Sequence, residues 1–358
     1  MTLPLRLLTF DFVRWIGALL VTLMALMLLA AGLGRALPAT PGISMEETHG
    51  DNTEISLLDV DRSLRVNLTR SPALDFNAAW SLDGTRMAFT SIRDGRVQLL
   101  LLTLGTGGGV RRLGDQSIAS SVRPVWSPDG KSVVYEVELH NAKDLYIVDV
   151  DAPLIPGDNP RPLVVSRWDD RFPVWSPDGS QIAFVSWRTG DAEIFLIHPD
   201  GSNLTNLTND PGWDVSPAWS PDGSQIAFFS LRGVYRQLYV MNRDGSGVRQ
   251  LTNTQEVNNG NYWGAPVWSP DGQAIAYQSV INGSPKIVVA QVDGSGERSL
   301  TDDARLEALP LWLPGERMVY MAGVGAHTAL YVVDGDGYTR ALTPDDLSVK
   351  APTLWHIP

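Results

Sequence analysis

Cysteine is absent from this sequence of 358 residues, which excludes disulfide bonds, covalent haem attachment and cysteine-ligated iron–sulfur or zinc sites. Basic residues are scarce too, because 28 Lys and Arg face 40 Asp and Glu and leave a formal net charge of −12. A phosphate backbone demands a basic surface, so we expect no nucleic-acid partner. The five histidines are scattered and show no HExxH or HxH spacing, so no metal and no cofactor are expected.

The motifs of hydrolytic enzymes are also missing. No GxSxG turn, which carries the nucleophilic serine of α/β-hydrolases, occurs in the sequence. The Asp-Gly pairs at Asp200, Asp244, Asp293 and Asp334 lack the twelve-residue ligand spacing of calcium loops, so we interpret them as hairpin turns. Catalytic residues are therefore not predicted, and we expect the protein not to be an enzyme.

What the sequence does contain is a repeated stretch. Residues 173–186 read PVWSPDGSQIAFVS, and related copies bring the total to six, with their tryptophans spaced by 46, 49, 44, 49 and 44 residues. This period is typical of propeller blades. The tryptophans at the repeat position are Trp80, Trp126, Trp175, Trp219, Trp268 and Trp312. The predicted fold is all-β, a β-propeller of four-stranded antiparallel blades.

The copy that starts at Pro217 shows how one blade is built. An apolar segment ends at Trp219, Ser-Pro-Asp-Gly makes a turn in which Gly223 can take a positive φ, and IAFFS follows as a second strand. LYVM and VRQLT are the expected third and fourth strands, separated by an Asp-Gly-Ser-Gly turn. Because the central strands are apolar on consecutive residues, neighbours must cover both faces of each sheet. We expect the repeated tryptophan to fill the space between adjacent blades, burying on the order of 200 Å².

The WSPDG motif followed by IAF and Ser resembles the WD40-like PD40 repeat of TolB-type propellers over roughly residues 54 to 355. The resemblance implies a binding platform and leaves the ligand open. PD40 propellers are also similar to oligogalacturonate lyases, whose metal is held by histidines from several blades. A carbohydrate-active or metal-dependent, lyase-like enzyme on the same scaffold is therefore the alternative function.

The N-terminal part of the chain carries an uncharged apolar run over residues 16–34. As a helix it would span roughly 28 Å, close to the hydrocarbon thickness of about 30 Å, and it is longer than the core of a secretory signal. Arg6 and Arg14 precede the run and acidic residues follow it, so the remainder is predicted to be extracytoplasmic, in the periplasm or at the cell surface. A cleaved signal peptide is the alternative. The predicted divisions are a cytoplasmic stub with a transmembrane signal anchor (1–35), a linker (36–53) and the propeller (54–358).

The two ends of the propeller region complement each other. EISLLDVD from Glu54 and LRVNLT from Leu64 match the third and fourth strands of a blade, whereas APTLW from Ala351 matches a first strand. We therefore predict a closing blade that is shared by both termini and lacks its second strand, which gives seven blades. A ring of six blades with loose ends is the alternative.

A group of tryptophans outside the repeat positions marks the predicted binding surface. Trp168, Trp213 and Trp263 precede three successive first strands, in loops that share one face of the ring, whereas Trp187 stands elsewhere. Aromatic side chains among charged neighbours are typical of protein interfaces, although each ring could instead pack under its own loop. We predict a scaffold that binds an envelope or membrane protein, with a glycan as the less favoured ligand. The candidate partner-binding residues are Trp168, Asp169, Asp170, Arg171, Trp213, Asp214, Tyr262 and Trp263.

Overall fold

The structure is a computed structural model, and it describes residues 42–105, 108–114, 123–139, 141–254, 264–301, 305–324, 327–344 and 347–355. The predicted anchor at residues 16–34 lies outside these ranges. Within them, no helix has the length and hydrophobicity needed to cross a bilayer.

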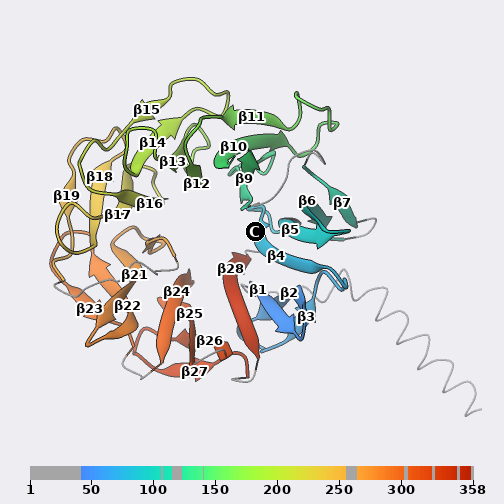
Figure 1. Cartoon of the computed structure of the whole chain (residues 1–358). Helices are drawn as coiled ribbons and strands as arrows, with labels where there is room; N and C mark the ends of the chain where they lie inside the picture. The colour runs from blue at the N-terminus through green and yellow to red at the C-terminus, as the bar shows by residue number, and fades with distance from the viewer. Residues whose placement is uncertain are drawn as a thin grey trace, which may run out of the picture.

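Seven four-stranded antiparallel sheets stand around a ring, which confirms the predicted seven-bladed propeller (Figure 1). We number the six full blades in chain order. Blade 1 consists of β4 (Leu74–Trp80), β5 (Arg86–Arg93), β6 (Arg96–Thr103) and β7 (Val110–Arg112). Blade 2 consists of β8 (Val125–Trp126), β9 (Ser132–Leu139), β10 (Ala142–Asp149) and β11 (Arg161–Val164). Blade 3 consists of β12 (Asp170–Trp175), β13 (Ile182–Ser186), β14 (Glu193–Ile197) and β15 (Thr205–Asn206).

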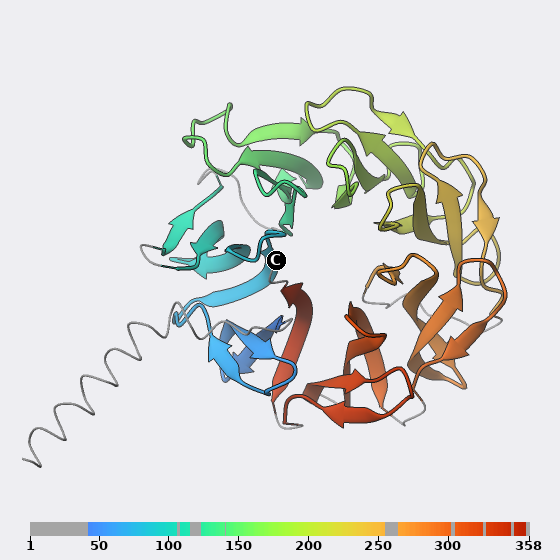
Figure 2. The ribbon, with the colours of Figure 1, turned by 180° about the vertical axis from the view of Figure 1, so that it is seen from behind.

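The remaining blades repeat this order. Blade 4 consists of β16 (Asp214–Trp219), β17 (Gln225–Ser230), β18 (Gln237–Asn242) and β19 (Arg249–Gln250). Blade 5 consists of β20 (Val267–Trp268), β21 (Ala274–Ile281), β22 (Ser284–Gln291) and β23 (Glu297–Ser299). Blade 6 consists of β24 (Leu306–Leu313), β25 (Arg317–Val324), β26 (His327–Val333) and β27 (Thr339–Ala341). The first strand of each blade is innermost (Figure 2).

This strand order gives the ring two different faces. The WSPDG turns join first to second strands, and they share one face, here called the turn face, with the turns between third and fourth strands. The loops that lead from one blade into the next lie on the opposite face, here called the entrance face, together with the turns between second and third strands. The loops that carry Trp168 and Trp213 therefore belong to the entrance face, as predicted from the sequence.

The repeated tryptophans connect adjacent blades, as predicted. In blades 2, 3, 5 and 6 the indole N–H reaches a backbone carbonyl of the preceding blade's first strand, and in blade 1 Trp80 Nε1 donates to Ser44 Oγ of the closing blade at 2.9 Å. Trp126 Nε1 donates to the Ala79 oxygen at 2.9 Å, and Trp268 Nε1 donates to the Ala218 oxygen at 3.0 Å. The indole of the repeated tryptophan thus fills the apolar space between blades and also donates a hydrogen bond. Together these contacts fix the distance between neighbouring inner strands.

The aspartates of the WSPDG turns serve the turns themselves, as expected. In blade 2, Ser127 Oγ donates to Asp129 Oδ1 at 2.6 Å and accepts the backbone N–H of Ser132 at 2.9 Å. The hydrogen bond from Ser127 lowers the pKa of Asp129. Gly130 closes the turn with a φ of 69°, a conformation that favours glycine.

Arginines of the outer strands add a second connection between blades. In blade 4, Arg249 Nη2 donates to the Val292 oxygen of blade 5 at 2.6 Å. Arg340 of blade 6 reaches the Val60 oxygen of the closing blade at 2.9 Å. Each arginine donates to a backbone carbonyl outside the strand ladders. Adjacent blades are therefore connected at the outer rim of the ring as well as at its inner edge.

The closing blade differs from the prediction in one strand. Its order is β28 (Ser348–Trp355), β1 (Gly42–His49), β2 (Asn52–Asp59) and β3 (Arg65–Asn67). The blade is shared by both termini, as predicted, but it has four strands. The second strand, expected to be missing, is β1, which pairs with β28 on one side and β2 on the other (Figure 1). The predicted linker over 36–53 is therefore wrong from residue 42 onward, and the propeller begins there.

Candidate partner-binding face

Two of the predicted tryptophans are exposed on the entrance face. Trp168 retains 41% of its accessible surface and Trp213 retains 53%, in the loops that lead into blades 3 and 4. An indole packed beneath its own loop would be buried, so packing does not explain these two side chains. Tyr262 and Trp263, the corresponding residues ahead of blade 5, lie outside the described residues.

The aspartates next to these tryptophans lie inside the protein. Asp170 and Asp214 are both fully buried, so neither can contact a partner, contrary to the sequence prediction. Asp170 Oδ1 accepts a charge-assisted hydrogen bond from Arg188 Nη2 at 2.8 Å, and Asp214 Oδ2 accepts one from Arg232 Nη2 at 2.7 Å. These ion pairs link the start of each first strand to the turn after the second strand. Their role is to position the tryptophan loops.

Both arginines are held in place by aromatic rings of their own blade. The Arg232 guanidinium carbon lies 5.6 Å from the Phe228 ring centroid and 5.2 Å from that of Tyr239. Arg188 has the same relation to Phe184 and Phe195 in blade 3. Stacking of this kind leaves the guanidinium edge free to pair with the aspartate. Blades 3 and 4 therefore present their tryptophans on equivalent frameworks.

The loop that carries Trp168 is folded around one serine. Ser166 Oγ donates to Asp170 Oδ2 at 2.9 Å and accepts the Trp168 N–H at 3.1 Å, and the Ser166 N–H reaches Asp144 at 3.0 Å. The backbone N–H of Trp187 donates to the Asp169 oxygen at 3.1 Å, so Trp187 stands beside this loop. Asp169 and Arg171 also have internal contacts. Asp169 Oδ1 accepts the Lys143 N–H at 3.0 Å, and Arg171 Nε lies 3.7 Å from Glu136 Oε2.

The loop that carries Trp213 lies tightly against the neighbouring turn. A side chain on Gly212 would approach the Arg232 backbone nitrogen to 2.5 Å, so only glycine fits there. The Leu231 N–H donates to the Trp213 oxygen at 2.9 Å, and the Asp214 N–H donates to the Ala192 oxygen at 2.7 Å. The exposed indole thus stands on an ordered backbone, which reduces the entropy that a partner must remove on binding.

A buried carboxyl group supports the same loop from below. Glu193, which is 1% exposed, accepts hydrogen bonds from Thr208 Oγ1 and from the Asp210 N–H. The pKa of Glu193 is raised to about 7, chiefly by burial and also by the negative charges of Asp214 and Asp191, while the bond from Thr208 opposes the shift. Glu193 is therefore a group whose protonation changes near neutral pH.

The substitution Glu193→Gln should remove part of the pH dependence of stability. The folded-state pKa of about 7 exceeds the reference value of 4.5, so protonated Glu193 stabilises the fold below pH 4.5, and this contribution is lost as the pH rises through about 7. We expect the melting temperature of the variant, relative to wild type, to rise steadily between pH 5 and pH 8.

Blade 4 provides the matched control for this experiment. Gln237 occupies the equivalent position and accepts hydrogen bonds from Thr252 Oγ1 at 2.9 Å and from the Thr254 N–H at 3.1 Å. Glutamine is therefore compatible with this network. Gln237→Glu should introduce the opposite pH dependence, and parallel pH curves for wild type and Glu193→Gln would contradict the assignment.

Apolar side chains that the sequence analysis did not single out extend the exposed surface. Val165 is 58% exposed, Leu231 is 38% exposed and Val234 is 86% exposed, and all three lie in entrance-face loops or turns of blades 2 to 4. Together with Trp168 and Trp213 they form a group that we call the tryptophan patch. Contiguous exposed apolar groups with charged neighbours mark interaction sites more often than isolated ones do. The signal in the sequence was an apolar residue in a segment of turn composition.

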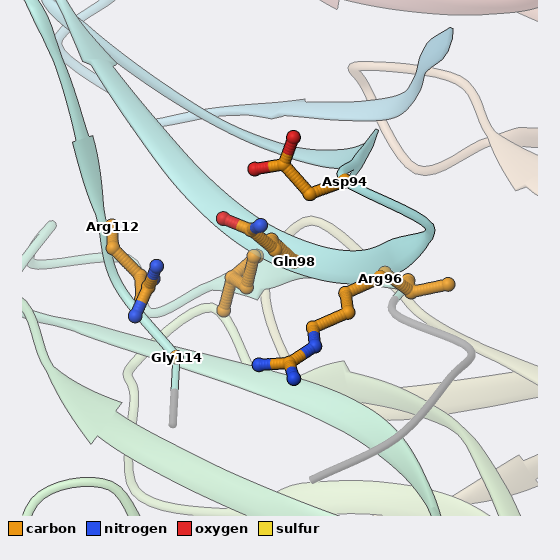
Figure 3. Close-up of a pocket in the computed structure, with 7 residues that line it drawn as sticks. Asp94, Arg96, Gln98, Arg112 and Gly114 are labelled. Atoms are coloured by element: carbon orange, nitrogen blue, oxygen red, sulfur yellow. The ribbon is translucent and has the colours of Figure 1, made fainter. Parts of the chain in front are cut away.

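A pocket of about 330 Å³ lies on blade 1, away from the loops of the tryptophan patch (Figure 3). Side chains from β6 and β7 surround it, and Asp94, Arg96, Gln98 and Arg112 make its lining mainly polar. Pockets for small molecules are usually lined by apolar and aromatic groups. The tryptophan patch is therefore the stronger candidate site.

Metal-ligating side chains do not gather anywhere in the described part of the chain. No group of three or more His, Asp or Glu residues there could hold a metal ion. His140 and His356 lie outside the described residues.

Comparison with known proteins gives one family match. The family described as TolB beta propeller domain (PD40) matches residues 164–356. A curated relative, the Protein TolB homolog of Chlorobium luteolum, is 31% identical over 132 residues, which is 36% of this chain and 28% of the relative. The match thus spans less than a third of that relative's length.

Solved structures share the fold at low sequence identity. A puromycin-hydrolyzing peptidase of Mycobacterium tuberculosis has a TM-score of 0.68 at 18% identity, over 85% of this chain and 53% of the peptidase. An oligogalacturonate lyase in complex with manganese has a TM-score of 0.64 at 18% identity, over 78% of this chain and 82% of the lyase. Similarity at this level of identity shows the propeller fold alone.

Proposed function

The chain belongs to the TolB beta propeller domain family, and from this we propose that it is a non-catalytic scaffold that binds a protein partner of the cell envelope. The tryptophan patch is the observation that carries the proposal. Two exposed indoles stand on loops of adjacent blades, and exposed apolar side chains lie in the same loops or in the neighbouring turn. Large aromatic groups that need little ordering are the usual anchors of protein interfaces.

The position of the N-terminal end gives the scaffold an orientation. Gly42 pairs with Trp355 at the end of β28, so the described chain begins at the turn face. We propose that residues 16–34 anchor the protein as a single-pass segment and leave the propeller on the extracytoplasmic side. The tryptophan patch would then face away from the membrane, toward a partner in the periplasm or at the cell surface. Tethering raises the effective concentration of the propeller near other membrane components.

The proposal is tested with the variant Trp168→Ala/Trp213→Ala. Full-length protein is extracted in mild detergent, and the proteins that co-purify with wild type are identified and quantified. Truncation of two anchor residues should reduce recovery of the partner at least about tenfold, since each such residue contributes about 2 kcal/mol or more.

The matched control is Tyr338→Ala, because Tyr338 is 66% exposed but lies on the turn face. It should leave recovery of the partner unchanged. Equal recovery from the tryptophan variant and wild type, with both folded by their melting curves, would exclude the tryptophan patch as the contact surface.

A further inference from the structure

A second set of side chains combines positive charge with an aromatic ring, four residues along the chain from Trp168. Phe172 lies on β12 of blade 3, three residues beyond Asp169, and two guanidinium groups approach its ring. The Arg171 guanidinium carbon is 4.8 Å from the ring centroid, and that of Arg123, from the adjacent blade 2, is 5.3 Å from it. The group therefore lies between the inner strands of two blades, at the edge that borders the ring centre (Figure 1).

The propeller fold does not require an aromatic side chain at this position. Phe172 has a φ of 56°, and the corresponding residues of blades 1, 4 and 6, Asn77, Ser216 and Leu309, share this conformation. Each lies within a shift in register between the first and second strands. The bulge is thus a feature of several blades, whereas the aromatic side chain at this position is found in blade 3 and not in blades 1, 4 and 6. A positive φ is unfavourable for a bulky side chain such as that of Phe172.

The charges around this ring are unequal in their exposure. Glu136 is fully buried, and its carboxylate accepts the Phe172 N–H at 2.9 Å and lies 3.7 Å from Arg171 Nε. Arg123 is exposed, and among the described residues it makes no ion pair or hydrogen bond beyond its stacking on Phe172. Two positive charges thus share one ring. The carboxylate that pairs with Arg171 among the described residues, Glu136, is buried.

We propose that Arg123, Arg171 and Phe172 form a carboxylate-binding site that receives an acidic group of the protein partner. Guanidinium groups stacked on an aromatic face keep their N–H edges available for bidentate bonds to a carboxylate. The net charge of −12 does not prevent this, because distant exposed charges are screened beyond about 8 Å at physiological ionic strength. The site rests on the proposed function and adds the chemistry of the partner, a carboxylate close to the residue that packs on Trp168.

The site can be tested without knowing the partner. Fluorescently labelled hexaglutamate with an amidated C-terminus serves as the probe, and its affinity for the full chain is measured by anisotropy at about 0.15 M NaCl. Wild type should bind hexaglutamate and not hexaglutamine. Arg123→Gln should weaken binding up to about fivefold, since an exposed charge pair contributes up to about that factor. Arg171→Gln should weaken it further.

Control variants separate this site from general charge effects and from the tryptophan patch. Arg298→Gln changes an exposed arginine on the outer strand of blade 5 and should leave affinity unchanged. Trp168→Ala/Trp213→Ala should also bind hexaglutamate normally, so failure of this proposal and failure of the proposed function are told apart. Hexaglutamine with a free C-terminus tests a chain end as the carboxylate source. Absence of hexaglutamate binding, or equal loss in Arg123→Gln and Arg298→Gln, would overturn the proposal.

Discussion

Deletion of residues 348–358 should lower the melting temperature by about 10 °C or more, on a scale of about 2–4 °C per kcal/mol for domains of about 150–250 residues. The deletion removes β28, which pairs with β1 along the closing blade and places fully buried Val349 against Ile43 and Leu330. It also leaves β1 as an unpaired edge strand that borders the ring centre, which favours association between chains. Differential scanning calorimetry and size-exclusion chromatography measure the two effects.

The control is a shorter deletion of residues 356–358, which keeps β28 complete. A synthetic peptide of residues 345–358, added to the truncated protein, should restore part of the lost stability by adding the missing strand. A truncated protein with an unchanged melting temperature would show that β28 does not close the ring.

Asp214→Ala should destabilise the protein by about 3 kcal/mol, because it leaves the Arg232 guanidinium without its buried partner. The pair is short, at 2.7 Å, and the Asp214 side chain is fully buried. Asp210 lies 3.7 Å from Arg232 Nε and compensates part of the lost charge, so the expected loss is at the lower end of the range for buried pairs. Urea denaturation of the purified protein measures the free energy of unfolding.

The double variant Asp214→Ala/Arg232→Met separates charge from packing. Methionine can lie on the Phe228 and Tyr239 rings that now hold the guanidinium, so most of the lost stability should return. A double variant no more stable than Asp214→Ala alone would mean that the aspartate acts through its backbone contacts and not through the ion pair.

The sequence predicted the blades because each carries its own local signal. The repeated tryptophan and the WSPDG turn mark the first two strands of a blade, and the structure places both as expected. The donation from Trp126 to the Ala79 oxygen is an addition that the sequence did not predict. β1 carries no such signal, since no WSPDG turn precedes it in the chain. Its residues Glu46 and Glu47 are charged yet buried, because Glu46 accepts the Asn77 N–H and Glu47 pairs with Arg65. Because these buried positions carry polar residues, β1 could not be recognised from an apolar pattern in the sequence.

The candidate site was predicted in part, for a related reason. The positions of Trp168 and Trp213 in exposed loops follow from the spacing of the repeats, but the burial of Asp170 and Asp214 does not. Each aspartate pairs with an arginine 18 residues later, which the hairpin of first and second strands brings back. An Asp five residues before the repeat Trp, followed by Ser-x-Arg, is the signal that could have revealed this pairing. Asp75, Ser91 and Arg93 repeat the pattern in blade 1.

The place of β1 in the closing blade determines how the ring would respond to mechanical force. Any pull transmitted through the chain ahead of Gly42 acts along β1, which is hydrogen-bonded on both sides, to β28 and to β2. Such a pull loads both ladders in shear, so many hydrogen bonds must fail together instead of opening one after another. A tether that drew on the propeller would therefore meet its greatest resistance at the seam that joins the two ends of the chain, and the ring would open only if that seam ruptured.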